Sequence, residues 1–106
     1  KRLSITASNG NAAPWRSTVQ TTDLPAGVNR LEVDLTVGAG AAGALRYWLN
    51  APAGTTEGAV SGSIPNLNNA GWVGVDTATP NYRLTHAGQI VSFDTFDSRR
   101  QTYIGH

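Results

Sequence analysis

Residues 30–37 read Arg-Leu-Glu-Val-Asp-Leu-Thr-Val, in which polar and apolar side chains alternate without a break. Because successive side chains of a β-strand point to opposite faces, four apolar side chains are expected on one side of an extended strand: Leu31, Val33, Leu35 and Val37. The pattern is typical of a strand with one buried face. It predicts that Val33 lies in the core and that Glu32 faces solvent.

The same signals divide the rest of the chain into short strands. Strand patterns are expected over residues 2–6, 15–21, 28–37, 44–49, 71–76, 82–84, 89–96 and 101–104. The segment Asp23 to Gly27 is a turn, because Pro25 fixes φ and Gly27 tolerates a positive φ, so the flanking strands form a hairpin or cross between sheets. With no helical periodicity, the sequence predicts an all-β fold, an antiparallel β-sandwich or jelly roll of about seven or eight short strands.

Two segments interrupt this pattern. Residues 38–43 are rich in glycine, but a phosphate-binding loop must open a helix, and the residues that follow have strand composition. We therefore interpret 38–43 as a flexible connector. Residues 50–70 are predicted to form a long ordered loop without regular structure, held in place by Val60, Ile64 and Leu67.

Length and composition restrict the function. The 106 residues allow one domain, 1–106, and the absence of cysteine excludes disulfides, thiolate metal sites and a cysteine nucleophile. Eight basic against seven acidic residues argue against a nucleic-acid partner, and the sequence has no apolar run of the roughly 20 residues needed for membrane insertion. Lys1 in place of Met suggests a processed chain or a fragment of a larger protein. The composition, with arginine preferred to lysine, suggests an extracellular or virion-surface location.

Outward-facing tryptophans are the main candidates for a binding site. If Leu45, Tyr47 and Leu49 face the core, alternation turns Trp48 outward, and the same argument applies to Trp72. The indole ring can cover the apolar face of a sugar while amides and carboxylates bind its hydroxyl groups. The residues expected to bind ligand are therefore Trp48, Trp72, Arg46, Asn50, Asn66, Asn68, Asn69 and Asp76. The alternative is a strand shifted by one residue, which would place both tryptophans in the core, where Trp15 is also expected.

No catalytic residue, metal ligand or cofactor is predicted. His86 and His106 lack the pattern of a catalytic triad, and no partner carboxylate for Glu57 can be identified from the sequence. A calcium site needs six to eight oxygen ligands, more than a few scattered aspartates supply: Asp76, Asp94 and Asp97. The pair Arg99 and Arg100 is interpreted as solvated, with an acidic-sugar contact as the alternative.

The stretch Trp15 to Asn50, with Leu-Pro-Ala-Gly at 24–27 before the long alternating strand, resembles the small β-sandwich accessory or receptor-binding domains of phage tailspikes, tail fibres and secreted bacterial hydrolases. The similarity covers about a third of the chain. It implies a non-catalytic module that binds glycan or drives oligomer assembly.

Two functions follow. The leading hypothesis is a non-catalytic recognition module that binds carbohydrate or a cell-surface receptor. The alternative is a structural domain of a virion surface, a capsid protrusion or a tail, which mediates homo-oligomer assembly as a dimer or trimer. The two differ in what an exposed tryptophan does: in a glycan-binding module it stays accessible to solvent in the native assembly, whereas in an assembly domain it is buried between subunits.

Overall fold

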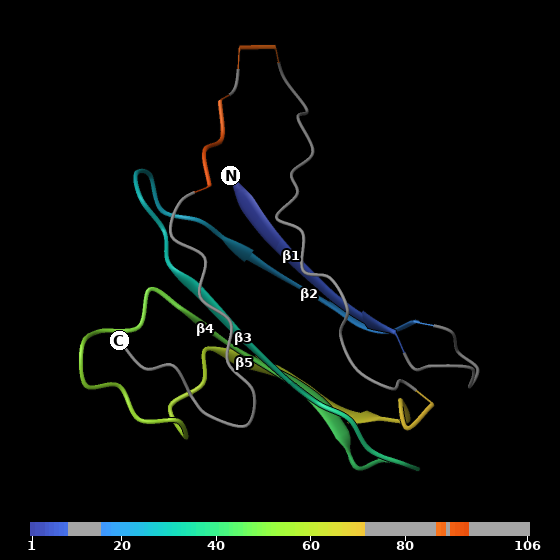
Figure 1. Ribbon diagram of the computed structural model, residues 1–106. Coiled ribbons are helices and arrows are strands. Elements are labelled where there is room, and N and C mark those ends of the chain that lie inside the picture. The colour runs from blue at the N-terminus through green and yellow to red at the C-terminus, as the bar shows by residue number, and fades with distance from the viewer. Residues whose placement is uncertain (9–15, 72–86, 89, 94–106) are drawn as a thin grey trace.

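The computed structural model describes residues 1–8, 16–71, 87–88 and 90–93, and within these ranges the chain is all-β, with no helix (Figure 1). Two antiparallel sheets are present, one of β1 and β2 and the other in the order β3-β4-β5. The strands are β1 (Arg2–Ser8), β2 (Arg16–Asp23), β3 (Leu31–Thr36), β4 (Gly43–Leu49) and β5 (Gly62–Leu67). The prediction of an all-β chain is confirmed.

Most of the strands that the sequence predicts after residue 70 lie outside the described residues. Residues 90–93 carry no strand, and the segments 72–86 and 94–106 lie outside the described residues, as does Trp15. In the part of the chain that the structure describes, no helix is long and apolar enough to cross a membrane.

The turn at Asp23 to Gly27 carries the chain from one sheet to the other. Gly27 has φ 95°, as predicted. The Asn29 Nδ2 group donates hydrogen bonds to the backbone oxygens of Pro25 and Gly27, each at 3.1 Å. The strands on either side of this turn, β2 and β3, belong to different sheets. This is one of the two arrangements expected from the sequence.

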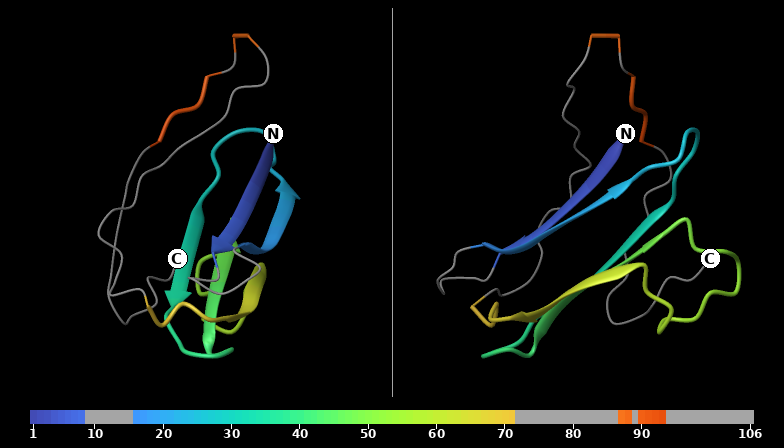
Figure 2. Two further views of the ribbon diagram at one scale, coloured as in Figure 1. Left: turned by 90° about the vertical axis from the view of Figure 1, so that its right-hand side faces the viewer. Right: turned by 180° about the vertical axis from the view of Figure 1, so that it is seen from behind.

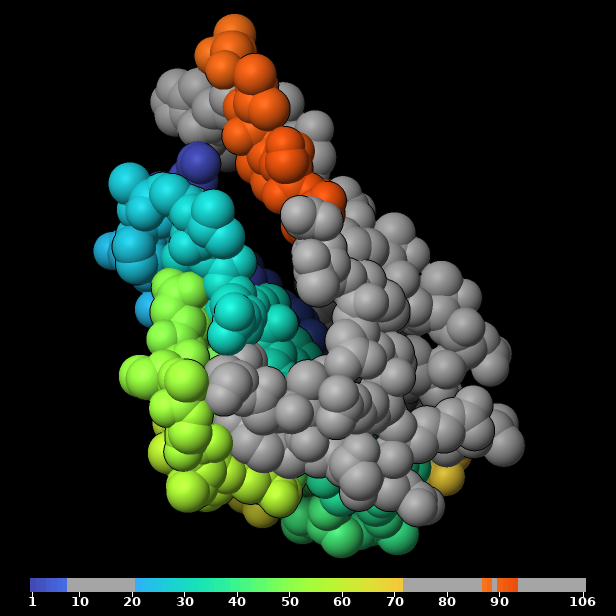
Figure 3. Space-filling model, turned by 60° about the vertical axis from the view of Figure 1, so that its left-hand side comes forward, coloured from blue at the N-terminus to red at the C-terminus, as the bar shows by residue number. Residues whose placement is uncertain are grey.

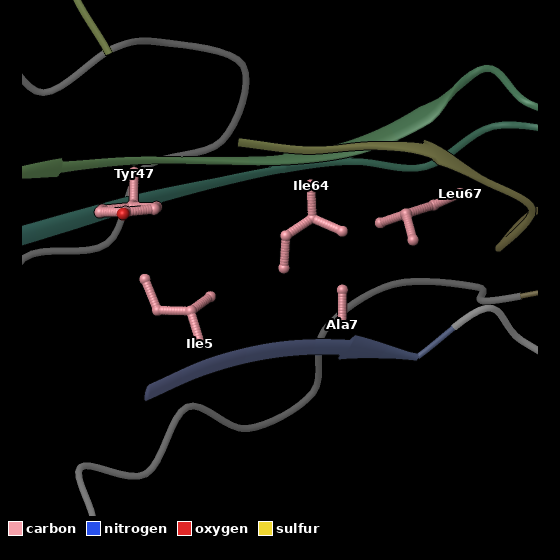
Figure 4. Packing of buried hydrophobic residues seen from close by; sticks show 5 residues of the cluster. All are labelled: Ile5, Ala7, Tyr47, Ile64 and Leu67. Atoms are coloured by element: carbon pink, nitrogen blue, oxygen red, sulfur yellow. The ribbon is translucent and has the colours of Figure 1, made fainter. Parts of the chain in front are cut away.

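The core lies where β1 packs on β4 and β5. Side chains from β1 point toward those of the larger sheet, and the cluster consists of Ile5, Ala7, Tyr47, Ile64 and Leu67 (Figure 4). Leu45 and Leu49 pack against it and are partly buried. The predicted orientation of β4, with Leu45, Tyr47 and Leu49 inward, is confirmed.

The burial of β3 is the reverse of the prediction. Val33 exposes 50% of its surface, whereas Glu32 exposes only 7%. Val33 does face the same side as Tyr47, its partner in the register. The ribbon of β1 and β2, however, has its main contacts to the larger sheet at β5, so among the described strands none covers the apolar side of β3 (Figure 2, left). Glu32 lies on the other side of the sheet, paired with Trp48, and that side is covered.

A second correction concerns residues 50–70, which contain β5. Leu45 pairs with Ile64 and Gly43 with Leu67, so Pro65 and Asn66 together face one residue of β4 in a β-bulge. Asn66, within this bulge, adopts the left-handed conformation, φ 61°. Because the extra residue brings Ile64 and Leu67 to the same face despite their odd spacing, simple alternation does not reveal the strand.

The glycine-rich segment connects two strands, as predicted, and forms a hairpin loop that ends where β4 begins at Gly43. The Ala42 N–H group donates to the Ala39 oxygen at 3.0 Å, and Gly40 has φ 63°. The loop joins β3 directly to its antiparallel neighbour β4, so it does not open a helix.

Candidate functional site

A charged cluster lies on the face of β3 and β4 opposite the core. Asp34 and Arg46 are opposite each other in the register. Asp34 Oδ2 accepts hydrogen bonds from Arg46 Nε at 3.0 Å and from Nη2 at 2.7 Å. Glu57, from the loop between β4 and β5, places Oε1 2.7 Å from the same Nη2. One guanidinium group is therefore shared by two carboxylates.

Trp48 forms the base of this cluster. It lies two residues after Arg46 on the same face of β4, and the guanidinium carbon is 5.4 Å from the centre of its ring, within the range of a cation–π interaction. The prediction of a solvent-exposed Trp48 is wrong, because its exposed fraction is 0%. Trp48 does face away from the core cluster, but this second face is also covered. The indole therefore supports Arg46 and does not offer its ring to a ligand in this structure.

Arg46 is held in its charged form by its two partners. The hydrogen bonds that Arg46 donates, to Glu57 first and to Asp34 next, raise the pKa of Arg46 above its usual value. Arg46 therefore remains a cation, and together with Asp34 and Glu57 it carries a formal charge of minus one. The side chains are partly exposed, 33% for Arg46, 40% for Asp34 and 55% for Glu57, so the cluster is accessible from solvent.

Asn50 has a structural role at the end of β4. It adopts φ 53° and its Oδ1 accepts the Arg30 N–H group at 2.8 Å, while its own N–H group donates to the Arg30 oxygen at 2.8 Å. Its Nδ2 group donates to Asn29 Oδ1 at 2.8 Å. The side-chain amide thus closes the end of the β3–β4 pair.

Asn69 is a buried structural residue. Its exposed fraction is 0%, and Oδ1 accepts the Gly38 N–H group at 2.8 Å while Nδ2 donates to the Thr36 oxygen at 3.3 Å. Its backbone N–H group donates to the Gly38 oxygen at 3.1 Å. These bonds hold the chain after β5 against the start of the β3–β4 loop.

The other predicted ligand residues are not brought to the cluster by any described contact. Asn66 is exposed at the bulge of β5, and Asn68 is half-buried beyond its end. Trp72 and Asp76 lie outside the described residues. The predicted site thus brings Arg46 and Trp48 together, and adds two residues that sequence reasoning missed, Asp34 and Glu57. The alternation of residues 30–37 does put Asp34 outward, but only the strand register shows that it meets Arg46.

A second candidate surface is the uncovered apolar side of β3, which we call the β3 row: Leu31, Val33, Leu35 and Val37. Leu31, Val33 and Val37 expose 44%, 50% and 42% of their surfaces, and Leu35 is partly buried. The segment that contains β3, in teal, is visible at the surface in Figure 3. Among the described strands, β3 has β4 as its single neighbour.

The described residues contain no group of three or more histidine, aspartate or glutamate side chains that could hold a metal ion. The aspartates weighed for calcium, Asp76, Asp94 and Asp97, lie outside the described residues. Comparison of the chain with models of known families, with curated proteins and with solved structures found no match. The function is therefore inferred from the two surfaces.

Proposed function

We propose that this chain is a non-catalytic assembly module that pairs with a second copy of itself through the β3 row. The observation that carries the proposal is that three apolar side chains of β3 and the residue that follows it, Leu31, Val33 and Val37, are 42–50% exposed. Contiguous exposed apolar residues on a soluble protein commonly mark interaction surfaces.

The sequence of β3 also lacks the features that prevent strands from pairing. Edge strands are usually protected by lysine, proline, a bulge or an inward-pointing charge. β3 reads Leu-Glu-Val-Asp-Leu-Thr, with no lysine and no proline; its charged residues, the buried Glu32 among them, lie on the face opposite the row and place no charge within the row itself. Asp34 is already bound to Arg46. The strand is thus suited to antiparallel pairing by its backbone and by its row.

A two-fold arrangement of two β3 strands suits this sequence. Pairing about Leu35 sets Val33 of one copy opposite Val37 of the other, so that apolar residues meet on one face. On the other face Asp34 lies opposite Thr36, which avoids placing like charges directly opposite each other. The same surface of each subunit is used, and the product is a closed dimer.

Sedimentation velocity over a concentration series tests the proposal. We expect the unmodified chain to form a dimer as its concentration rises, and Val33→Asp to remain monomeric. Val28→Asp is the matched control, because Val28 is fully exposed in the connection before β3 and lies outside the row. A chain that stays monomeric at its highest soluble concentration, or equal association of both variants, would contradict assembly through β3.

Glycan or receptor recognition is the second candidate function, and the charged cluster supports it. Asp34, Arg46 and Glu57 offer acceptors and donors side by side on a partly exposed face, a composition suited to the hydroxyl groups of a sugar. The burial of Trp48 removes the stacking platform on which the sequence hypothesis relied. For this reason we place recognition second.

We further propose that the complete domain is a sandwich or jelly roll of about seven or eight strands, supported by the packing of β1 on β4 and β5. The likeness to domains of tailspikes, tail fibres and secreted hydrolases, and an extracellular or virion-surface location, are consistent with a small cysteine-free module for assembly or recognition.

A further inference from the structure

Arg46 is held in position by contacts that do not involve Glu57. Asp34 Oδ2 accepts hydrogen bonds from both Nε and Nη2, and the guanidinium plane is supported by the buried Trp48 ring, 5.4 Å from its carbon. Both supports come from neighbouring positions of one sheet. The guanidinium would therefore keep its orientation if the Glu57 carboxylate moved away.

Glu57 makes a different kind of contact. The hydrogen bonds described on either side of it close local turns, from Thr55 to the Pro52 oxygen and from Ala59 to the Thr56 oxygen, and the loop is tied to β4 farther along, at Ser61. Its carboxylate is the more exposed partner and accepts one hydrogen bond, from Nη2. An exposed ion pair of this kind contributes little to stability, so the contact can be exchanged.

The cluster retains unused hydrogen-bonding capacity. Within the described residues, Arg46 Nη1 donates no hydrogen bond, and Asp34 Oδ1 accepts none. A carboxylate placed at the end of the guanidinium could bond to Nη1 and Nη2 together, the two-point geometry that arginine favours and that Glu57 does not use. Asp34 Oδ1 would accept a hydroxyl group beside it.

We propose that Glu57 occupies the place of a ligand carboxylate, and that the ligand is an acidic sugar of the hexuronate type. Its carboxylate replaces that of Glu57 on Arg46, and one of its hydroxyl groups donates to Asp34. The exchange leaves the formal charge of the cluster unchanged, since one carboxylate replaces another. The pairing of a donor for carboxylate with an acceptor for hydroxyl favours a uronate over an acidic peptide, whose side chains carry no neighbouring hydroxyl. The inference rests on the second candidate function, recognition of glycan.

Titration with D-glucuronate, followed by the Nε signal of Arg46 in nuclear magnetic resonance spectra, tests the inference on the complete chain. We expect the signal of the unmodified chain to shift on titration, and Glu57→Gln to bind about two- to fivefold more tightly, because a weak internal competitor has been removed. Arg46→Lys keeps the charge but loses the two-point geometry, and should lose binding while its melting temperature verifies the fold. D-glucose, without a carboxylate, should bind far more weakly than glucuronate.

The possible outcomes separate this inference from the functions on which it depends. Equal binding of glucose and glucuronate would overturn the carboxylate assignment while supporting glycan recognition. Equal affinity of Glu57→Gln and the unmodified chain would overturn the role of Glu57. Tighter binding of a glutamate-containing peptide than of glucuronate would overturn the choice of sugar. No shift with any sugar would overturn both the inference and glycan recognition, and leaves assembly through β3 to its own test.

Discussion

Glu32 and Val33 are adjacent on β3, yet the glutamate exposes 7% of its surface and the valine 50%. This inverts the ordinary relation between side-chain chemistry and burial. The inversion has a geometrical cause, since the ribbon of β1 and β2 packs on the core face of the larger sheet near β5 and leaves the β3 row on that face open, while the opposite face, which carries Glu32 and Trp48, is covered. The row is therefore available to a partner.

Val33→Asp should leave the domain folded. Because Val33 is half-exposed, a carboxylate there stays in contact with water, and we expect a loss of about 1 kcal/mol or less in the free energy of unfolding. Thermal unfolding should be measured at low protein concentration, because assembly itself stabilises the folded state. Unfolding of this variant would instead place the β3 row in the core of the monomer.

Trp48→Ala should be severely destabilising. The ring has no exposed surface, and truncating a buried large aromatic side chain typically costs about 3–5 kcal/mol through lost burial and the cavity that remains. The change is measured as a loss of unfolding free energy in denaturant. Val28→Ala, at a fully exposed position, serves as the control and should be silent. A Trp48→Ala variant as stable as the unmodified chain would show that the indole lies on the surface.

Gly43→Ala should destabilise the junction of β4 and β5. A β-carbon at this position would lie 2.6 Å from the backbone oxygen of Leu67 and would also collide with the Asn69 side chain, so the two strands would have to separate. We expect a loss of about 1–3 kcal/mol, as for other overpacked core sites. Gly58→Ala is the matched control, since nothing lies within 4 Å of its β-carbon. Equal melting temperatures of the two variants would rule out this close approach.

Asn69→Ala should cost about 2 kcal/mol, because it leaves the Gly38 N–H group and the Thr36 oxygen without their side-chain partner in a partly buried site. Asn66→Gly tests the neighbouring asparagine. It should change stability little, because the side chain is exposed and glycine adopts the positive φ of the bulge without strain. If denaturant unfolding gives the reverse order, the assignment of Asn69 as the structural asparagine is wrong.

Local patterns in the sequence predict the strands well where alternation is unbroken. The orientation of β4, the turn with Gly27 and the role of 38–43 as a connector between strands all follow from neighbouring residues, because they depend on backbone preferences and a period of two. β5 cannot be recognised from the sequence pattern, since the bulge at Pro65 and Asn66 breaks the period of two. Here the information needed is the pairing with β4, which a single sequence does not contain.

The burial of β3 and the charged cluster are also hard to predict, because both depend on how strands and loops are placed relative to each other. Alternation shows that Val33 and Glu32 face opposite sides, but the position of the second sheet decides which side is covered. Likewise, Trp48 points away from the core cluster, as alternation predicts, but that second face is covered and not open to solvent. Asp34, Arg46 and Glu57 come from two strands and a loop, so their meeting depends on register and loop path.

The most direct test of assembly through β3 is a nuclear Overhauser measurement on a mixture of isotope-labelled and unlabelled chains, filtered to report contacts between copies. If two copies pair through β3, we expect contacts between the methyl groups of Val33 and Val37 of different copies, with Leu35 at the two-fold axis. Val28 should make no such contacts. Contacts between copies that exclude the β3 row, or none in a sample that sediments as a dimer, would contradict it.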